Sequence, residues 1–285
     1  MITPAAYTTG FVTSKDGTKI GYRQMGKGPG VILVHGGLQA SQNFMALGNA
    51  LADEFTVYIP DRRGRGLSGP FGDNYSIAAD AEDMQALVYQ TKAQNIFGLS
   101  SGAIVTLQTA IITPSLKKVA LYEPPILVDG VDHTNMELEY ESALLNGNFG
   151  KAMISIIRGT GDSSMFAVLP AFITAPFMNF AMNRQQKQVK GDDVPLKALI
   201  PTFRYDSILV SGAKNIINKS RNLKAGVLLL GGSKSRKFLK MALDQLNAAL
   251  PGAKRVEFKG LGHLAASNGG KPAIIANELR RFFKE

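Results

Sequence analysis

The 285-residue sequence contains no cysteine, which excludes disulfide bonds, thiolate metal sites and a cysteine nucleophile. It also lacks an uninterrupted apolar run of about 18 residues, the length needed to cross a bilayer. The longest apolar stretch, residues 165–182, is broken by Pro170 and Pro176. The first ten residues show neither the basic region nor the apolar region of a signal peptide. We therefore expect a cytoplasmic protein with no membrane span and no signal peptide.

Acidic residues are missing from a long internal segment. Residues 207–243 contain no Asp or Glu, and the whole chain carries a formal net charge of +10. The lysines are scattered, however, and form neither a basic stripe nor a nucleic-acid-binding module. We expect no nucleic-acid partner, and the charge is explained either by a solubilising surface or by attraction of acidic substrates.

Strand and helix patterns alternate along most of the chain. A hairpin around Lys15-Asp16-Gly17 is followed by short apolar runs that end at Gly-rich turns and precede helical patterns. This alternation predicts a doubly wound, mainly parallel α/β sheet. The predicted strands are residues 31–34, 55–59, 95–99, 118–122, 226–230 and 254–258, and the predicted helices are residues 43–53, 76–91, 101–112, 236–249 and 271–284.

The alternation stops after Pro124-Pro125. From there to about residue 222 the patterns are helical, with no apolar run typical of a buried strand. We predict a core of residues 1–125 and 223–285 with a helical cap of residues 126–222. Such an insertion is expected over the carboxyl edge of the strands, where α/β sheets bind ligands.

The pentapeptide Gly98-Leu99-Ser100-Ser101-Gly102 lies between a predicted strand and a predicted helix. A G-x-S-x-G turn in this setting holds its central serine in strained backbone angles, and the flanking glycines avoid a clash between strand and helix. We predict Ser100 as a nucleophile and the Ser101 amide as an oxyanion donor. The alternative is that Ser100 only caps the helix.

The loop His35-Gly36-Gly37-Leu38 follows the predicted strand at residues 31–34. Its position suits a second oxyanion donor, which we assign to the Gly37 amide, with the Leu38 amide as the alternative. The ring of His35 is expected to brace this loop through hydrogen bonds rather than to act in catalysis.

A serine nucleophile needs a general base whose pKa lies near neutral pH, and imidazole is the usual one. Of the two remaining histidines, His263 follows the predicted strand at residues 254–258, at the carboxyl edge of the sheet. We predict His263 as the base. His133 lies in the insertion, and we expect it to be solvated or to lie at the N-terminal end of a helix.

These segments together resemble the α/β-hydrolase fold superfamily. The resemblance rests on His35-Gly36-Gly37, on P-D-R-R-G-R-G-L-S-G at residues 60–69, on residues 98–102 and on Gly260-Leu261-Gly262-His263. It implies a Ser–acid–His triad in that chain order, a two-amide oxyanion hole, and neither a metal nor a cofactor. It also implies hydrolysis of esters or related acyl bonds. Serine rather than aspartate at the nucleophile position argues against dehalogenase and epoxide hydrolase chemistry.

The triad acid of most superfamily members follows the strand that is predicted here at residues 226–230. This sequence has Ser233-Lys234-Ser235 there, and a serine cannot carry the charge that stabilises an imidazolium. Glu123 directly follows the neighbouring predicted strand, 118–122, and keeps the chain order of the triad. It is the predicted acid, as the resemblance to haloalkane dehalogenases also implies. The alternative is a glutamate that closes a strand and pairs with a surface cation.

Other carboxylates are weaker candidates for the triad. Asp129, Asp132 and Asp206 are expected in loops of the insertion, and Asp244 in a helix that faces elsewhere. We expect Asp61 to pair with one of the arginines 62, 63 or 65 and to brace its turn.

We therefore expect a serine hydrolase that cleaves a small or medium hydrophobic carboxylic ester through an acyl-enzyme. The same triad could instead serve perhydrolase, C–C hydrolase or lyase chemistry. A further alternative is a non-catalytic small-molecule receptor, which the missing acid at residues 233–235 favours. The oligomeric state stays open. The expected substrate contacts, chosen for adaptable apolar side chains, are Leu38, Phe166, Phe172, Phe177 and Met178.

Overall fold

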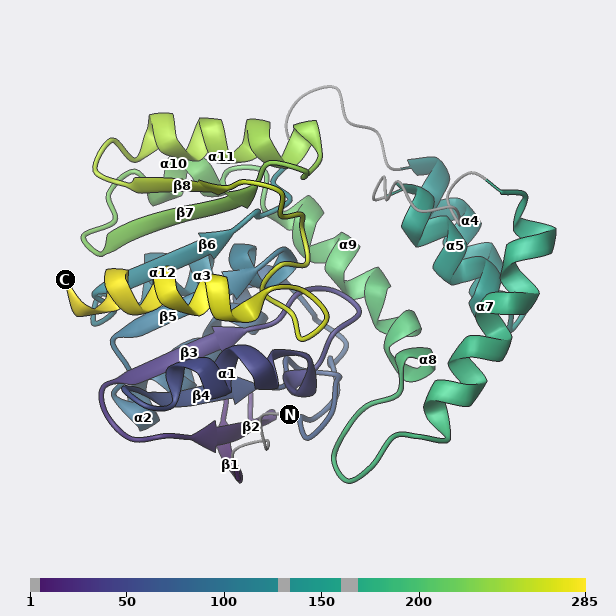
Figure 1. The fold of residues 1–285 in the computed structure, drawn as a ribbon, viewed down its shortest axis with the longest axis horizontal. Coiled ribbons are helices and arrows are strands. Elements are labelled where there is room, and N and C mark those ends of the chain that lie inside the picture. The colour runs from purple at the N-terminus through teal and green to yellow at the C-terminus, as the bar shows by residue number, and fades with distance from the viewer. Residues whose placement is uncertain (1–5, 128–133, 160–168) are drawn as a thin grey trace. The chain divides into compact units, whose positions relative to one another are not determined.

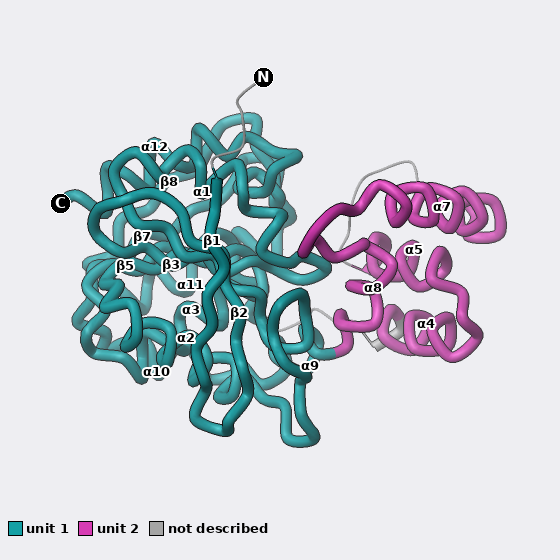
Figure 2. Tube along the Cα trace, turned by 90° about the horizontal axis from the view of Figure 1, so that it is seen from below, with its two compact units in different colours: residues 1–128, 205–285 teal, residues 129–204 magenta. Residues whose placement is uncertain are grey.

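The computed structural model describes residues 6–127, 134–159 and 169–285. The chain divides into two compact units, coloured separately in Figure 2. Unit 1 comprises Met1–Val128 and Tyr205–Glu285, and unit 2 comprises Asp129–Arg204. The second boundary differs from the predicted one, because residues 205–222 belong to unit 1. The reason is their packing, since Leu209, Ala213 and Ile216 are buried in the core of that unit.

The described part of unit 1 contains an eight-stranded sheet in the order β1-β2-β4-β3-β5-β6-β7-β8 (Figure 1). Strand β2 pairs antiparallel with β1 and with β4, and the other neighbours are parallel. The strands are β1 (Thr8–Thr13), β2 (Lys19–Met25), β3 (Gly30–Val34), β4 (Thr56–Pro60), β5 (Asn95–Leu99), β6 (Lys118–Tyr122), β7 (Gly226–Gly232) and β8 (Lys254–Phe258).

Helices cover both faces of this sheet. One face packs against α1 and α12, and the other packs against α2, α3, α10 and α11. The predicted doubly wound, mainly parallel architecture is confirmed. The helices of unit 1 are η1 (Ser41–Phe44), α1 (Met45–Leu51), α2 (Ile77–Thr91), α3 (Ser101–Ile112), α9 (Phe203–Gly212, which begins two residues before the unit boundary), α10 (Ile216–Ser220), α11 (Lys237–Ala249) and α12 (Pro272–Lys284).

The central strands are mainly apolar because both faces of the sheet are covered, and β3 is apolar at every position. In β3, Val31 and Leu33 join the core cluster beneath α1 and α12, whereas Ile32 and Val34 join the cluster beneath α2 and α3. Side chains of a strand alternate between faces, so a continuous apolar run fits a strand that is buried on both sides. This packing fixes where each strand ends, and the candidate site lies at those ends.

Unit 2 is helical in its described part. Helix α5 packs against both α4 and α7. Its elements are α4 (Thr134–Leu145), α5 (Phe149–Gly159), α7 (Ala171–Gln186), α8 (Leu196–Leu199) and η2 (Ile200–Thr202). Among the described residues, no helix combines the length and the apolar composition that a bilayer crossing requires.

Candidate active site

Ser100 lies between the end of β5 and the start of α3, with a backbone φ of 56° and ψ of −128°. A left-handed φ is costly for a residue with a side chain. The turn is also tightly packed. A Cβ built on Gly98 would lie 2.4 Å from the Gly102 carbonyl oxygen, and one on Gly102 would lie 2.3 Å from the His35 carbonyl oxygen. The expected steric need for both glycines is confirmed.

The loop after β3 lies against this serine. A Cβ on Gly36 would be 3.1 Å from the Ser100 Cβ, and Leu38 has a left-handed φ of 55°. Within the described residues, the amides of Gly37 and Ser101 have no hydrogen-bond acceptor. For Ser101 this follows from its place at the first turn of α3, where amides lack partners within the helix. Two amide donors beside Ser100 are therefore available to a ligand.

His35 is fully buried and braces the loop, as expected. Its Nε2 accepts a hydrogen bond from the Arg62 amide at 3.2 Å, so its proton lies on Nδ1, which donates to the Gly36 carbonyl oxygen at 2.9 Å. Burial, together with the positive charges of Arg65 and Arg62, lowers the pKa of His35 well below its ordinary value. The ring is therefore neutral at neutral pH.

Glu123 and His263 are joined by a hydrogen bond of 2.7 Å between Oε2 and Nδ1. The carboxylate is fully buried at the end of β6, whereas the imidazole keeps 32% of its side-chain surface exposed. The second oxygen of Glu123 accepts the Gly232 amide at 2.6 Å. Glu123 also has a left-handed φ of 47°. The carboxylate is thus fixed on both oxygens, and it orients the ring.

The end of β7 supports this pair without supplying an acid. A Cβ on Gly231 would lie 3.2 Å from Oε1 of Glu123, and one on Gly232 would lie 2.3 Å from the Leu261 carbonyl oxygen. The Ser233 hydroxyl accepts the Gly260 amide at 2.8 Å. The segment after β7 therefore holds Glu123 and the loop that carries His263.

Backbone strain is concentrated at this site. Four non-glycine residues of the described chain have a left-handed φ, and three of them are Leu38, Ser100 and Glu123. The fourth, Lys92, ends helix α2 as a left-handed cap. Strain of this kind persists where function requires it and the surrounding packing enforces it.

Asp61 braces its turn through backbone amides. Its carboxylate accepts from Ser41 at 2.6 Å and from Leu67 at 3.0 Å. The expected ion pair between Asp61 and one of the three nearby arginines is wrong, because all three arginines pair with carboxylates other than that of Asp61. Arg62 pairs with Asp80 and Asp206, Arg63 with Asp16 and Asp83, and Arg65 with Asp206.

Asp206 was expected in a loop of the insertion, and it lies instead in helix α9, buried beside the nucleophile turn. It accepts a hydrogen bond from the Ser101 hydroxyl at 2.8 Å. Sequence reasoning missed this contact. The only signal was the arginine-rich segment after β4, which needs buried carboxylates from elsewhere.

A family model described as the alpha/beta hydrolase fold matches residues 29–269, which is most of the chain. The chain belongs to the alpha/beta hydrolase fold family. An uncharacterized hydrolase of Bacillus subtilis, YraK, is 34% identical over 116 residues, a match covering 39% of this chain and 43% of that protein. The match therefore spans less than half of the length of that curated relative.

Solved alpha/beta hydrolases resemble the whole chain. An alpha/beta hydrolase from Sphaerobacter thermophilus is 26% identical, with a TM-score of 0.76 and coverage of 96% of this chain and 100% of that one. An esterase from Exiguobacterium antarcticum is 18% identical, with a TM-score of 0.72 and coverage of 96% and 99%. At 18% identity, the similarity to the esterase shows only that the two proteins share a fold.

The residues that were expected to contact the substrate lie in separate parts of the chain. Leu38 lies in the loop beside Ser100. Phe172, Phe177 and Met178 lie on α7 of unit 2, where the two phenylalanines are 79% and 59% exposed. Phe166 and His133 lie outside the described residues. The role of these side chains in substrate binding stays a prediction.

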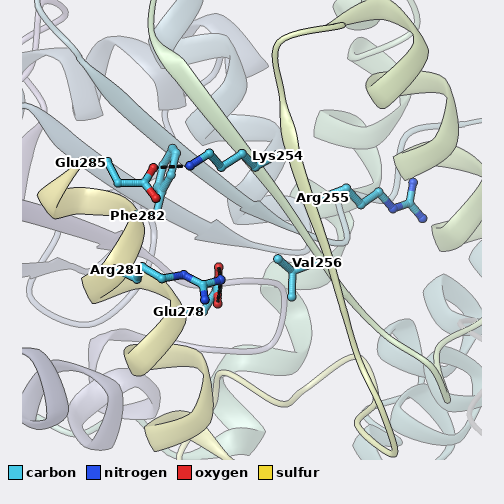
Figure 3. A pocket seen from close by; sticks show the side chains of 7 residues that line it. All are labelled: Lys254, Arg255, Val256, Glu278, Arg281, Phe282 and Glu285. Carbon is cyan, nitrogen blue, oxygen red and sulfur yellow. Dashed lines mark hydrogen bonds and ion pairs between the residues drawn. The ribbon is translucent and has the colours of Figure 1, made fainter.

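A surface cavity of about 460 Å³ lies elsewhere, between β8 and the end of α12 (Figure 3). Ion pairs line it, between Lys254 and Glu285 and between Arg281 and Glu278. Lys254 begins β8, so the cavity opens near the amino ends of the parallel strands, opposite the edge that carries Ser100 and Glu123. It is therefore separate from the candidate active site.

Proposed function

We propose that this alpha/beta hydrolase is a serine hydrolase that cleaves a small or medium hydrophobic carboxylic ester, or a related acyl bond, through an acyl-enzyme on Ser100. The observation that carries the proposal is the 2.7 Å hydrogen bond between His263 and the buried, doubly held carboxylate of Glu123. A fixed carboxylate behind a partly exposed imidazole, at the sheet edge that also carries a strained serine turn, supports nucleophilic acyl transfer.

The tautomer of His263 follows from its partner. Because Glu123 accepts at Nδ1, the imidazole proton lies on Nδ1 and the lone pair on Nε2 is free to take the proton of Ser100. The serine oxygen attacks the acyl carbon, and the resulting imidazolium is stabilised by the Glu123 charge. The amides of Gly37 and Ser101 receive the negative oxygen of the tetrahedral intermediate.

Collapse of that intermediate transfers the proton from His263 to the leaving alkoxide and leaves an ester on Ser100. A water molecule then gives a proton to His263 and attacks the acyl carbon, and the second collapse restores Ser100 and releases the acid. Every proton in this cycle passes through Nε2 of His263, whereas Glu123 keeps its charge throughout.

A non-catalytic receptor is disfavoured by the same contact. The receptor alternative rested on the absence of an acid after β7, and Glu123 supplies a carboxylate from the adjacent strand β6. Binding of a ligand does not by itself require a buried carboxylate against an accessible imidazole.

The test is hydrolysis of p-nitrophenyl esters of increasing acyl length, combined with labelling by a fluorophosphonate probe. We expect turnover that is fastest for short to medium chains, and covalent labelling at Ser100 that the Ser100→Ala variant loses. Ser235→Ala is the matched control, because that serine lies after β7 and its hydroxyl has no partner in the described structure. Equal ester turnover by wild type and Ser100→Ala would overturn the proposal.

A further inference from the structure

A buried ionic cluster lies beneath the nucleophile turn. It contains two arginines, Arg62 and Arg65, and two aspartates, Asp80 and Asp206, each at most 3% exposed. Arg62 pairs with Asp80 at 2.6 Å and with Asp206 at 2.8 Å, and Arg65 pairs with Asp206 at 2.5 Å. The two positive and two negative charges balance. Asp206 bridges the two arginines and is the centre of the cluster.

The cluster touches both sides of the proposed oxyanion hole. On one side, Oδ1 of Asp206 accepts the Ser101 hydroxyl at 2.8 Å. On the other side, Arg65 donates to the Gly36 carbonyl oxygen at 3.2 Å, and a Cβ on Gly37 would lie 3.1 Å from Oδ2 of Asp206. One carboxylate therefore lies against both residues whose amides would receive the oxyanion.

Asp206 is charged in this setting. Burial by itself would raise the pKa of Asp206, but the Arg65 and Arg62 guanidinium groups and their hydrogen bonds outweigh it and lower this pKa below its ordinary value. A charged acceptor makes shorter and stronger hydrogen bonds than a neutral one. The contact with Ser101 therefore restrains the start of α3 more firmly than a neutral amide would.

We propose that Asp206 is a positioning residue that sets the separation of the Gly37 and Ser101 amides by holding the Ser101 hydroxyl and, through Arg65, the Gly36 carbonyl. This inference rests on the proposed serine hydrolase function. Asp206 acts through its neighbours and does not touch the reacting atoms. Asp206 thus lies on the oxyanion side of the site rather than in the triad.

A neighbouring ion pair provides the matched control. Asp83 is also fully buried and binds one guanidinium through both oxygens, at 2.7 and 2.6 Å to Arg63. Among the described residues, Asp83 makes no hydrogen bond or ion pair with the oxyanion loop or the nucleophile turn. Asp83→Asn removes the same kind of charge at a similar depth, and it reports the effect of destabilisation alone.

The experiment compares wild type, Asp206→Asn and Asp83→Asn in ester hydrolysis and in inhibition by an aryl trifluoromethyl ketone, whose adduct with serine carries an oxyanion. Rates are normalised to the folded fraction. We expect Asp206→Asn to lower kcat by about tenfold or more with KM changed by less than about threefold, because an oxyanion donor acts on the transition state. The ketone should lose affinity by the same factor as kcat/KM, and Asp83→Asn should match wild type.

The outcomes separate the two proposals. Asp206→Asn with wild-type kcat and ketone affinity, in an enzyme that hydrolyses esters through Ser100, would overturn the positioning role and leave the proposed function intact. A wild-type protein that is not labelled at Ser100 would overturn the proposed function and this inference together.

A second variant covers a failure of Asp206→Asn to fold. Ser101→Ala removes the hydroxyl that donates to Asp206 and accepts from Arg62 at 3.1 Å, and it leaves both arginine pairs of Asp206 in place. It should lower kcat and ketone affinity in the same direction, with a smaller loss of thermal stability. Unchanged kcat and ketone affinity in Ser101→Ala would also overturn the positioning role.

Discussion

Nδ1 of His263 lies 2.7 Å from Oε2 of Glu123, although the two residues are 140 positions apart. Strands β6, β7 and β8 are adjacent and parallel, so their carboxyl ends meet at one edge of the sheet. Glu123 extends from the first of these ends beneath the loop that follows the last. Between them β7 ends in two glycines: Gly231 leaves room for the Glu123 carboxylate, and Gly232 leaves room for the backbone of Leu261.

Replacing Glu123 with glutamine should lower kcat by about 10³- to 10⁴-fold, because the imidazolium loses its charge partner and the ring its orientation. Glu123→Asp should retain more activity than glutamine only if the shorter side chain still reaches His263. The measurement is ester turnover, with circular dichroism to verify folding. Glu257→Gln, which removes an exposed carboxylate paired with Lys240, is the control and should be unaffected. Full activity in Glu123→Gln would refute the assignment.

Gly232→Ala should disable the site through the backbone. An added Cβ would lie 2.3 Å from the Leu261 carbonyl oxygen, so the loop that carries His263 must move. A displacement of about 1 Å costs on the order of 100-fold in rate, and the crowding costs about 1–3 kcal/mol of folding free energy. Gly252→Ala is the matched control, since nothing lies within 4 Å of its added Cβ. Kinetics and thermal unfolding measure both effects, and similar behaviour of the two variants would contradict the reasoning.

The parallel strands of the sheet and the approximate positions of their ends could be predicted from the sequence. Each central strand is mainly a short apolar run, because it is buried on both faces, and glycine or proline lies in the strand or in the turn that follows it. Glu123 was predicted from the resemblance, which implies an acid after one of two neighbouring strands, because Ser233 and Ser235 after the other strand cannot carry a charge. Its role in catalysis remains a prediction, although its contact with His263 is what the prediction requires.

The partners of the arginines could not be predicted. Arg62 and Asp206 are 144 positions apart, and no local spacing relates them. Residues 205–222 contain no strand pattern, so the sequence placed them with the insertion. Burial of Leu209 and Ile216 against the sheet places them in unit 1, and a single helix pattern cannot distinguish between the two packing partners.

Ser100→Gly should increase stability while it abolishes activity. Ser100 has a φ of 56°, a conformation that glycine adopts freely, so the variant releases strain of about 1 kcal/mol. Lys92→Gly is the matched control. Lys92 has the same φ of 56° at the end of α2 but a ψ of 24° rather than −128°, so Lys92→Gly should release the ordinary left-handed strain of about 1 kcal/mol and keep full activity. Thermal unfolding and ester turnover give the two readouts, and a loss of stability in Ser100→Gly would argue against strain at the nucleophile turn.

His35 makes the stability of the protein depend on pH. Its pKa is lowered in the folded state by burial and by the charges of Arg65 and Arg62, so the unfolded chain binds the proton first as the pH falls. The contribution of His35 to the free energy of unfolding is therefore at its full value above the pKa of this residue in the unfolded chain, about 6.5. Below that pH the contribution falls by about 1.4 kcal/mol per pH unit. Comparison with His35→Gln isolates this effect, because both proteins share every other titrating group, including Asp83, whose pKa burial raises to about 6.

Urea unfolding of the two proteins at several pH values between 5 and 8 measures the difference. We expect a constant gap in unfolding free energy above pH 7, with wild type more stable because His35 accepts the Arg62 amide and donates to Gly36. Below about pH 6.5 the difference in unfolding free energy should narrow by about 1.4 kcal/mol per pH unit, because only the wild-type chain takes up a proton at residue 35 when it unfolds. A gap that stays constant down to pH 5 would mean that His35 takes up its proton in the folded protein, and the oxyanion loop would then lose the acceptor that holds the Arg62 amide.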